Sequence, residues 1–153
     1  MLHAVGEAEA RRIHDREPSI ADRWADDYPF EGDLAALGGF LQATDRHGEQ
    51  RPFGYYQITR QSDRLAIGGI GFKGPPDAGA VEIGYGLVPT ARGRGYAAEA
   101  LVALMAIAST HRVTLVRADT SPDNAASRRT LERAGFNQVC FDDELLHYEA
   151  RLG

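Results

Sequence analysis

The feature that most limits the fold of this chain is a pair of glycines between a strand pattern and a helix pattern. Residues 80–88, AVEIGYGLV, alternate as a β-strand does, and residues from about 96 to 108 carry apolar side chains at helical spacing. Gly93 and Gly95 lie between the two patterns. Glycine lets another molecule approach the main chain closely, and backbone N–H groups at a helix start favour an anion. The sequence therefore predicts an anion-binding loop at this junction.

The remaining patterns predict an α/β (α+β) protein with a mixed, mostly antiparallel central sheet and helices on both faces. Turn residues such as QSD and KGPPDAG separate the strand patterns of the first half, as in an antiparallel meander. Helical patterns cover 7–16, 33 to about 43 with Asp33 as a possible cap, and 124 to a stop at Gly135. Strand patterns cover 55–60, 64–72, 113–120, 137–141 and 145–152.

Composition excludes several classes of protein. The 153 residues suit a single soluble domain, and a net charge of −5 argues against nucleic acid as the main ligand. A single cysteine, Cys140, excludes disulfides and zinc clusters, and the five histidines show no metal-binding spacing. No run of about 18 apolar residues predicts a membrane span, and the N-terminus lacks a signal-peptide pattern. We therefore expect a cytoplasmic protein with no metal and no membrane partner.

Glycines alone leave other interpretations open. Gly93 and Gly95 could simply form a tight turn. Together with Ala98 they also satisfy G-x-G-x-x-A, and Asp119 lies about 20 residues further on, as in nicotinamide-dinucleotide-binding oxidoreductases. Against that alternative, a hairpin meander precedes the glycines, and too little chain follows Asp119 for further βα units.

Three stretches together resemble the GNAT superfamily of acyl-CoA-dependent N-acetyltransferases. Residues 92–97, RGRGYA, match its pyrophosphate loop Q/R-x-x-G-x-G/A, and AVEIGYGLVP is similar to its fourth strand. The stretch NAASRRTLERAGF resembles its N-x-x-[AS]-x-x-x-[LY]-x-x-x-G-F helix. The matched core runs from about 55 to 148, and Ser127 and Leu131 are most like the branch that contains the ribosomal-protein N-terminal acetyltransferases.

The resemblance implies a single GNAT domain over 1–153, with a helical acceptor-side region at 1–50 and an acyl-CoA-binding core at 80–140. It implies direct transfer of acetyl from acetyl-CoA, as co-substrate, to the primary amine of a small molecule or peptide. A catalytically idle acyl-CoA sensor is the non-enzyme alternative. The residues expected to contact acetyl-CoA are Leu87, Val88, Arg92, Gly93, Arg94, Gly95, Tyr96, Ala97, Asn124 and Ser127.

The same resemblance assigns catalytic roles to three residues. Glu82 stands where several relatives place a general base, and the Gly86 N–H is expected to stabilise the thioester oxygen. Ser127 is assigned as the acid, because Leu131 occupies the position of the usual tyrosine. Three of the assigned residues could also have a purely structural role. Glu82 could form a surface ion pair, Ser127 could bond to the backbone of its own helix, and Asn124 could be only an N-cap.

The acceptor is expected to meet the segment between the first two helices. There Trp24, Asp26 and Asp27 offer an aromatic face and carboxylates, both of which attract ammonium groups. The alternative is a capped helix start with its aromatic side chains in the core. The family's first strand is reduced here to MLHAV, so a homodimer could cover the exposed sheet edge.

Overall fold

Seven strands form one mixed sheet in the computed structural model, which describes residues 1–153. The strand order is β1-β2-β3-β4-β5-β7-β6, and every neighbouring pair is antiparallel except β4 and β5. This confirms the predicted mostly antiparallel sheet. The strands are β1 Leu2–Ala4, β2 Tyr55–Thr59, β3 Ala66–Phe72, β4 Ala80–Leu87, β5 Leu115–Thr120, β6 Asn137–Phe141 and β7 Leu146–Arg151.

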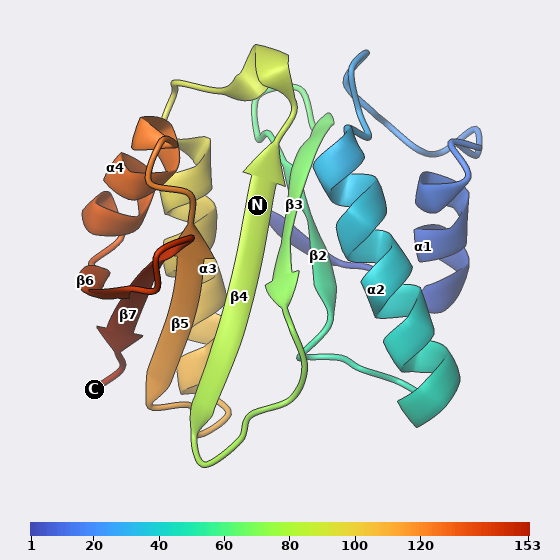
Figure 1. Ribbon diagram of the computed structural model, residues 1–153. Helices are drawn as coiled ribbons and strands as arrows, with labels where there is room; N and C mark the ends of the chain where they lie inside the picture. Colours follow the sequence, from blue (N-terminus) through green and yellow to red (C-terminus); the bar gives the residue numbers. More distant parts are fainter.

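Helices cover both faces of the sheet, as predicted (Figure 1). Helix α2 packs against β2, β3 and β4 and is itself covered by α1, whereas α3 packs against β1, β3 and β4 and contacts α4. No helix combines the length and the apolar character that crossing a bilayer requires. The helices are α1 Glu7–His14, α2 Glu31–His47, α3 Tyr96–Ser109 and α4 Ala125–Arg133, with a short 3₁₀ turn, η1, at Pro89–Ala91.

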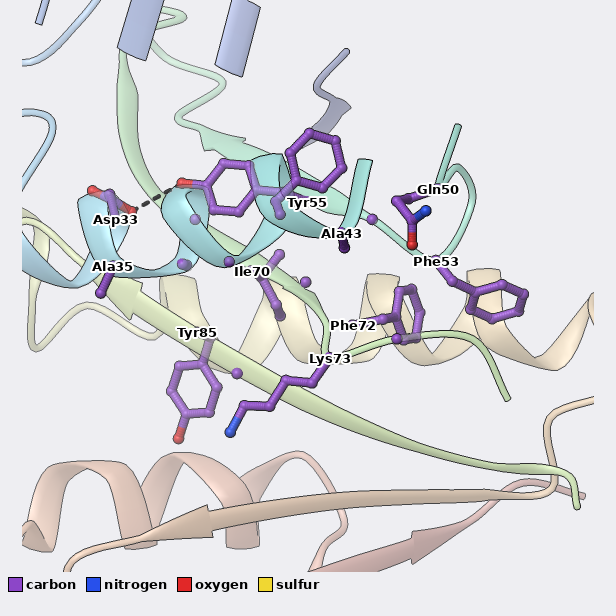
Figure 2. A pocket seen from close by; sticks show the side chains of 18 of the residues that line it. Asp33, Ala35, Ala43, Gln50, Phe53, Tyr55, Ile70, Phe72, Lys73 and Tyr85 are labelled. Carbon is purple, nitrogen blue, oxygen red and sulfur yellow. Dashed lines mark hydrogen bonds between the residues drawn. The ribbon is translucent and has the colours of Figure 1, made fainter. Parts of the chain in front are cut away.

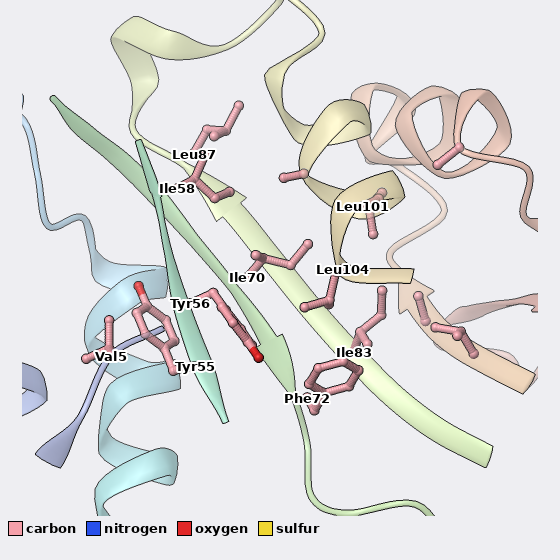
Figure 3. Close-up of a cluster of buried hydrophobic side chains, with 14 of the residues drawn as sticks. Val5, Tyr55, Tyr56, Ile58, Ile70, Phe72, Ile83, Leu87, Leu101 and Leu104 are labelled. Carbon is pink, nitrogen blue, oxygen red and sulfur yellow. The ribbon is translucent and has the colours of Figure 1, made fainter. Parts of the chain in front are cut away.

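The face of the sheet beneath α3 carries the main hydrophobic core (Figure 3). Ile70 of β3 and Ile83 of β4 meet Leu101 and Leu104 of α3, and all four side chains are buried. Burial of each such side chain contributes about 1.5–3 kcal/mol. This core fixes β4 against α3 and so fixes the position of the loop that joins them.

The opposite face of β3 and β4, beneath α2, is nearly bare of side chains. Gly69 pairs with Gly86 and Gly71 pairs with Gly84, so four glycines form a block on this face. Because glycine has no side chain, this glycine block leaves space above the sheet, and it forms the floor of the site described below.

Helix α2 differs from the sequence prediction at both of its ends. Helix α2 begins at Glu31 and continues to His47, whereas the pattern predicted 33 to about 43. Asp33 lies inside the first turn, and its carboxylate accepts the N–H of Phe30, the residue that precedes the helix, at 3.1 Å. Its capping role is thus exerted from within the helix. The first strand, Leu2–Ala4, is as short as the sequence indicated.

Candidate active site

The central strand β4 has an open edge over its second half. Its pairing with β5 covers only Ala80 to Glu82, after which the two strands part (Figure 1). The Val88 N–H donates to the Ile67 carbonyl oxygen at 2.8 Å, and the Glu82 carbonyl oxygen accepts from the Lys73 N–H at 2.8 Å. Even-numbered residues of β4 therefore turn their backbone groups toward β3.

That alternation decides which backbone groups face the open edge. The N–H groups of Tyr85 and Leu87 point to the side that β5 has left, and the Gly86 N–H points to β3. The geometry therefore does not favour Gly86 as the donor to a thioester oxygen. The Val88 N–H likewise points to β3. Leu87 and Val88 are both expected to contact acetyl-CoA, and of these two only Leu87 presents its N–H to the open edge.

Both glycines of the loop adopt backbone conformations that other residues disfavour. Gly93 and Gly95 have φ angles of 80° and 84°, in the left-handed region that side chains disfavour, and Gly95 is the residue that precedes α3. A Cβ built on Gly93 would meet no atom within 4 Å, so the space above the loop is open. The N–H groups from Gly93 to Ala97 lead into the N-terminus of α3, where Arg94 is exposed and Tyr96 is half-buried. An anion is favoured there.

Arg92 serves the local fold. Its Nε donates to the carbonyl oxygen of Leu87 at 3.0 Å, and its guanidinium lies 5.5 Å from the centre of the Phe30 ring. The side chain therefore ties the end of β4 to the start of α2 in this structure.

A pair of hydroxyls bridges β4 and α4. The Tyr85 and Ser127 hydroxyl oxygens lie 2.7 Å apart, and the Tyr85 hydroxyl also donates to the Ser127 carbonyl oxygen at 3.3 Å. Burial raises the pKa of Tyr85, and the hydrogen bond with Ser127 offsets this in part. Asn124 caps α4 by accepting the Ser127 N–H at 3.0 Å, which is the N-cap alternative raised above. The sequence assigned no role to Tyr85 and did not identify this pair.

Glu82 forms an ion pair at the edge of the glycine block. Its Oε1 lies 3.1 Å from Nζ of Lys73, and the two side chains are 46% and 51% exposed. A Cβ built on Gly84 would lie 3.3 Å from Cε of Lys73, so this lysine extends across β4 beside the glycine. Glu82 stands four residues before Gly86, about 13 Å along the strand.

A cavity of about 690 Å³ lies between α2 and the glycine block (Figure 2). Its roof consists of small residues on one face of α2, and its walls include the aromatic rings of Phe30, Phe40 and Tyr55. A Cβ on Gly86 would lie 2.5 Å from Cζ of Phe30, so the space beside that glycine is filled by a protein ring. The small residues of the roof are Gly32, Ala35, Ala36, Gly39 and Ala43.

One carboxylate lies deep in this cavity. Asp33 is 2% exposed and accepts a hydrogen bond from the Tyr55 hydroxyl at 3.0 Å in addition to the N–H of Phe30 (Figure 2). Burial raises the pKa of Asp33 to about 6, although the two hydrogen bonds act in the opposite direction. The sequence predicted Asp33 as a helix cap and did not select it as a candidate for binding the acceptor. The spacing of small residues along 32–43 was the available signal that this face of α2 lines a cavity.

The residues expected to recruit the acceptor lie outside this cavity. Trp24 packs edge-on against Tyr28, with the ring centres 5.5 Å apart, and Asp26 is exposed. Both carboxylate oxygens of Asp27 accept hydrogen bonds from Thr90, at 3.0 Å each. Burial tends to raise the pKa of Asp27, but these two bonds outweigh it and lower the pKa. The geometry favours the alternative, in which Trp24 and Asp27 stabilise the local fold before α2.

A mixed sheet with a parting central strand pair, beside a glycine loop at a helix start, defines the class of GNAT acetyltransferases. Comparison with known proteins agrees: a family model described as an acetyltransferase (GNAT) domain matches residues 1–137. The chain belongs to this family. It is accordingly an acetyl-CoA-dependent N-acetyltransferase, as predicted, and the dinucleotide-binding alternative is wrong because its parallel sheet is absent.

Individual relatives show the same family likeness. The chain is 27% identical over 132 residues to an uncharacterized N-acetyltransferase, YjdG, of Bacillus subtilis, covering 85% of this chain and 79% of that protein. An acetyltransferase structure from Agrobacterium tumefaciens aligns with a TM-score of 0.66 at 25% identity, over 99% of this chain and 90% of its own. A ribosomal-protein-alanine N-acetyltransferase structure from Brucella melitensis aligns with a TM-score of 0.66 at 19% identity, over 99% of both chains.

Proposed function

We propose that this enzyme acetylates a primary amine that enters through the cavity beneath α2 and attacks the thioester directly, with no covalent enzyme intermediate. One observation carries the proposal. Residues Tyr85 and Gly86 line the cavity, and the same stretch of β4 presents its open edge to the side where the glycine loop begins α3. Amine and thioester can therefore meet at a single stretch of backbone.

The chain has groups suited to each part of acetyl-CoA, which supplies an activated thioester when bound. The N–H groups of Gly93 to Ala97 would hold its diphosphate, where the open space above Gly93 leaves room. Leu87 and Tyr85 would pair with the pantetheine arm along the open edge. The side-chain carbonyl oxygen of Asn124 accepts the Ser127 N–H, and its NH₂ group would donate a hydrogen bond to acetyl-CoA.

The negative charge that develops on the thioester oxygen needs a fixed donor. An N–H on the open edge of β4, from Tyr85 or Leu87, is the candidate, because the Gly86 N–H is turned to β3. Loss of a donor of this kind typically costs about 3–4 kcal/mol of transition-state stabilisation.

Glu82 is proposed as the base. An alkylamine of pKa about 10.4 is only about 0.1% neutral at pH 7, so its proton must leave as the new C–N bond forms. Glu82 lies on the cavity face of β4 but stands about 13 Å from Gly86, so water must carry the proton to it. Lys73, the ion-pair partner of Glu82, also lines the cavity, so Glu82 lies next to the cavity and in contact with solvent.

The hydroxyl pair is proposed as the acid. When the C–S bond breaks, the sulfur leaves as a thiolate and requires a proton. Ser127, in the position that the family resemblance indicated, gives its proton to the sulfur and takes one from Tyr85, its hydrogen-bond partner at 2.7 Å. Burial raises the pKa of Tyr85, so its phenol is neutral at pH 7 and recovers the proton from solvent after each turnover.

Replacement of the base tests the proposal. Glu82→Gln should lower kcat for acetyl-CoA-dependent thiol release by about 100-fold, with the Kd for acetyl-CoA unchanged. Glu144→Gln, an exposed carboxylate in the turn before β7, is the matched control. Wild-type turnover by Glu82→Gln would remove Glu82 from the mechanism. A wild-type protein that binds acetyl-CoA but releases no thiol with any amine would instead support the sensor.

A further inference from the structure

The acceptor cavity contains a buried carboxylate with no cationic partner. Asp33 receives hydrogen bonds from the Phe30 N–H and the Tyr55 hydroxyl, and it forms no ion pair with any Lys, Arg or His. His47 and Lys73 also line the cavity, but Lys73 pairs with Glu82. A buried carboxylate is expensive unless a cation or several donors compensate for it.

The charge of Asp33 is present at neutral pH. Burial raises its pKa to about 6, which leaves the carboxylate mostly ionised at pH 7. Tyr55 faces Asp33 directly, and Tyr28 lies beyond it, hydrogen-bonded to Gln57. Burial raises the pKa of both phenols, so both stay neutral and the charge of Asp33 has no opposite charge beside it. An ammonium group that enters the cavity would compensate for the carboxylate.

The site lies at a distance from the reacting atoms. A Cβ on Gly69 would overlap the Tyr55 hydroxyl, so that hydroxyl stands directly over β3. The open edge lies on the side of β4 away from β3. A ligand chain paired with that edge would be two strand spacings, or about 10 Å, from β3. A cation held by Asp33 is therefore a different group from the nitrogen that attacks the thioester.

We propose that Asp33, positioned by Tyr55, binds a second ammonium group of the acceptor, so that the preferred substrate is a linear diamine. This inference rests on the proposed function. The small residues of α2 above and the glycine block below leave a low, mainly apolar space, which suits an unbranched methylene chain. The Phe30 and Phe40 rings flank that space and attract a cation as it passes.

Paired substrates provide the test. Octamethylenediamine and n-octylamine share one chain and differ in the second ammonium group. The wild-type kcat/KM should favour the diamine by about 30-fold or more, because loss of one partner of a buried charge pair typically costs at least about 2 kcal/mol. Asp33→Asn keeps the shape of the side chain and should bring the ratio to within about threefold. Glu31→Gln, an exposed carboxylate on the same helical turn, should leave the ratio unchanged.

A binding measurement separates the two possible failures. Without acetyl-CoA, octamethylenediamine should raise the Tm of the wild type but not that of Asp33→Asn. A wild-type kcat/KM ratio near one overturns the diamine inference while acetyl transfer stands, and this outcome does not depend on how well the variant folds. A diamine-dependent Tm shift without acetylation of any amine contradicts the proposed function, whereas the inference that Asp33 binds an ammonium group still stands.

Discussion

At the scale of single residues, the Tyr85 hydroxyl is proposed to replace an acidic tyrosine that α4 lacks. The family's usual acidic tyrosine is replaced by Leu131, which is fully buried and offers no proton. Tyr85 reaches α4 from the neighbouring strand and meets Ser127 there. Two residues from separate elements can thus provide the proton donor that one tyrosine provides elsewhere.

Removal of that hydroxyl should slow the chemical step. Tyr85→Phe is expected to lower kcat by about 100-fold, because general acid catalysis typically contributes 10²–10⁴-fold, while the Kd for acetyl-CoA changes little. Steady-state kinetics and isothermal titration measure the two quantities. Tyr56→Phe is the control, since the Tyr56 hydroxyl donates to the Pro52 carbonyl oxygen at 2.7 Å. An unchanged kcat in Tyr85→Phe would remove the hydroxyl pair from the mechanism.

Some residues could be predicted from sequence because their roles are local. Gly93 and Gly95 require left-handed backbone in a turn that neighbouring residues define, and the structure confirms both φ angles. Gly86 could not be interpreted in this way. The group that fills its missing side chain is the ring of Phe30, which lies 56 positions earlier in the chain and approaches only through folding.

At the scale of elements, the N-terminal turn of α2 combines a structural role with the proposed binding role. Asp33 fixes the start of the helix through the Phe30 N–H, and it also presents the one buried carboxylate of the cavity. The local sequence predicted a helix cap at this position. It did not predict the burial, which depends on Tyr55 and the glycine block of β3 and β4.

Burial of this carboxylate should make stability depend on pH in an identifiable direction. The pKa of Asp33 is about 6 in the folded protein, against an unperturbed value of 3.8 for the unfolded chain. The contribution of Asp33 to the free energy of unfolding is therefore greatest below pH 3.8 and is lost as pH rises through about 6. The free energy of unfolding of wild type relative to Asp33→Asn should fall by about 3 kcal/mol between pH ~4 and ~8. Urea unfolding at a series of pH values measures this difference. A difference that stays constant with pH would contradict the burial of an ionisable carboxyl.

At the scale of the whole molecule, the proposed acid and the proposed acceptor cavity lie on opposite faces of one strand, β4. The α3 face of β4 carries the core and the hydroxyl pair, and the α2 face carries the glycine block and the cavity (Figures 2 and 3). The loss of pairing with β5 after Glu82 leaves the edge between them open. Strand periodicity predicted the sheet, but the point where β4 and β5 separate is a property of their packing and has no signal in either strand alone.

Hydrogen exchange tests the central claim most directly. Acetyl-CoA should slow exchange of the backbone amides of Tyr85 and Leu87 and of residues 93–97, because the open edge and the glycine loop would gain hydrogen-bond acceptors together. NADH should leave these amides unchanged. Protection of both segments by acetyl-CoA alone is the predicted result. Tight binding of acetyl-CoA with no change in exchange at Tyr85 and Leu87 would place the thioester elsewhere and contradict the account.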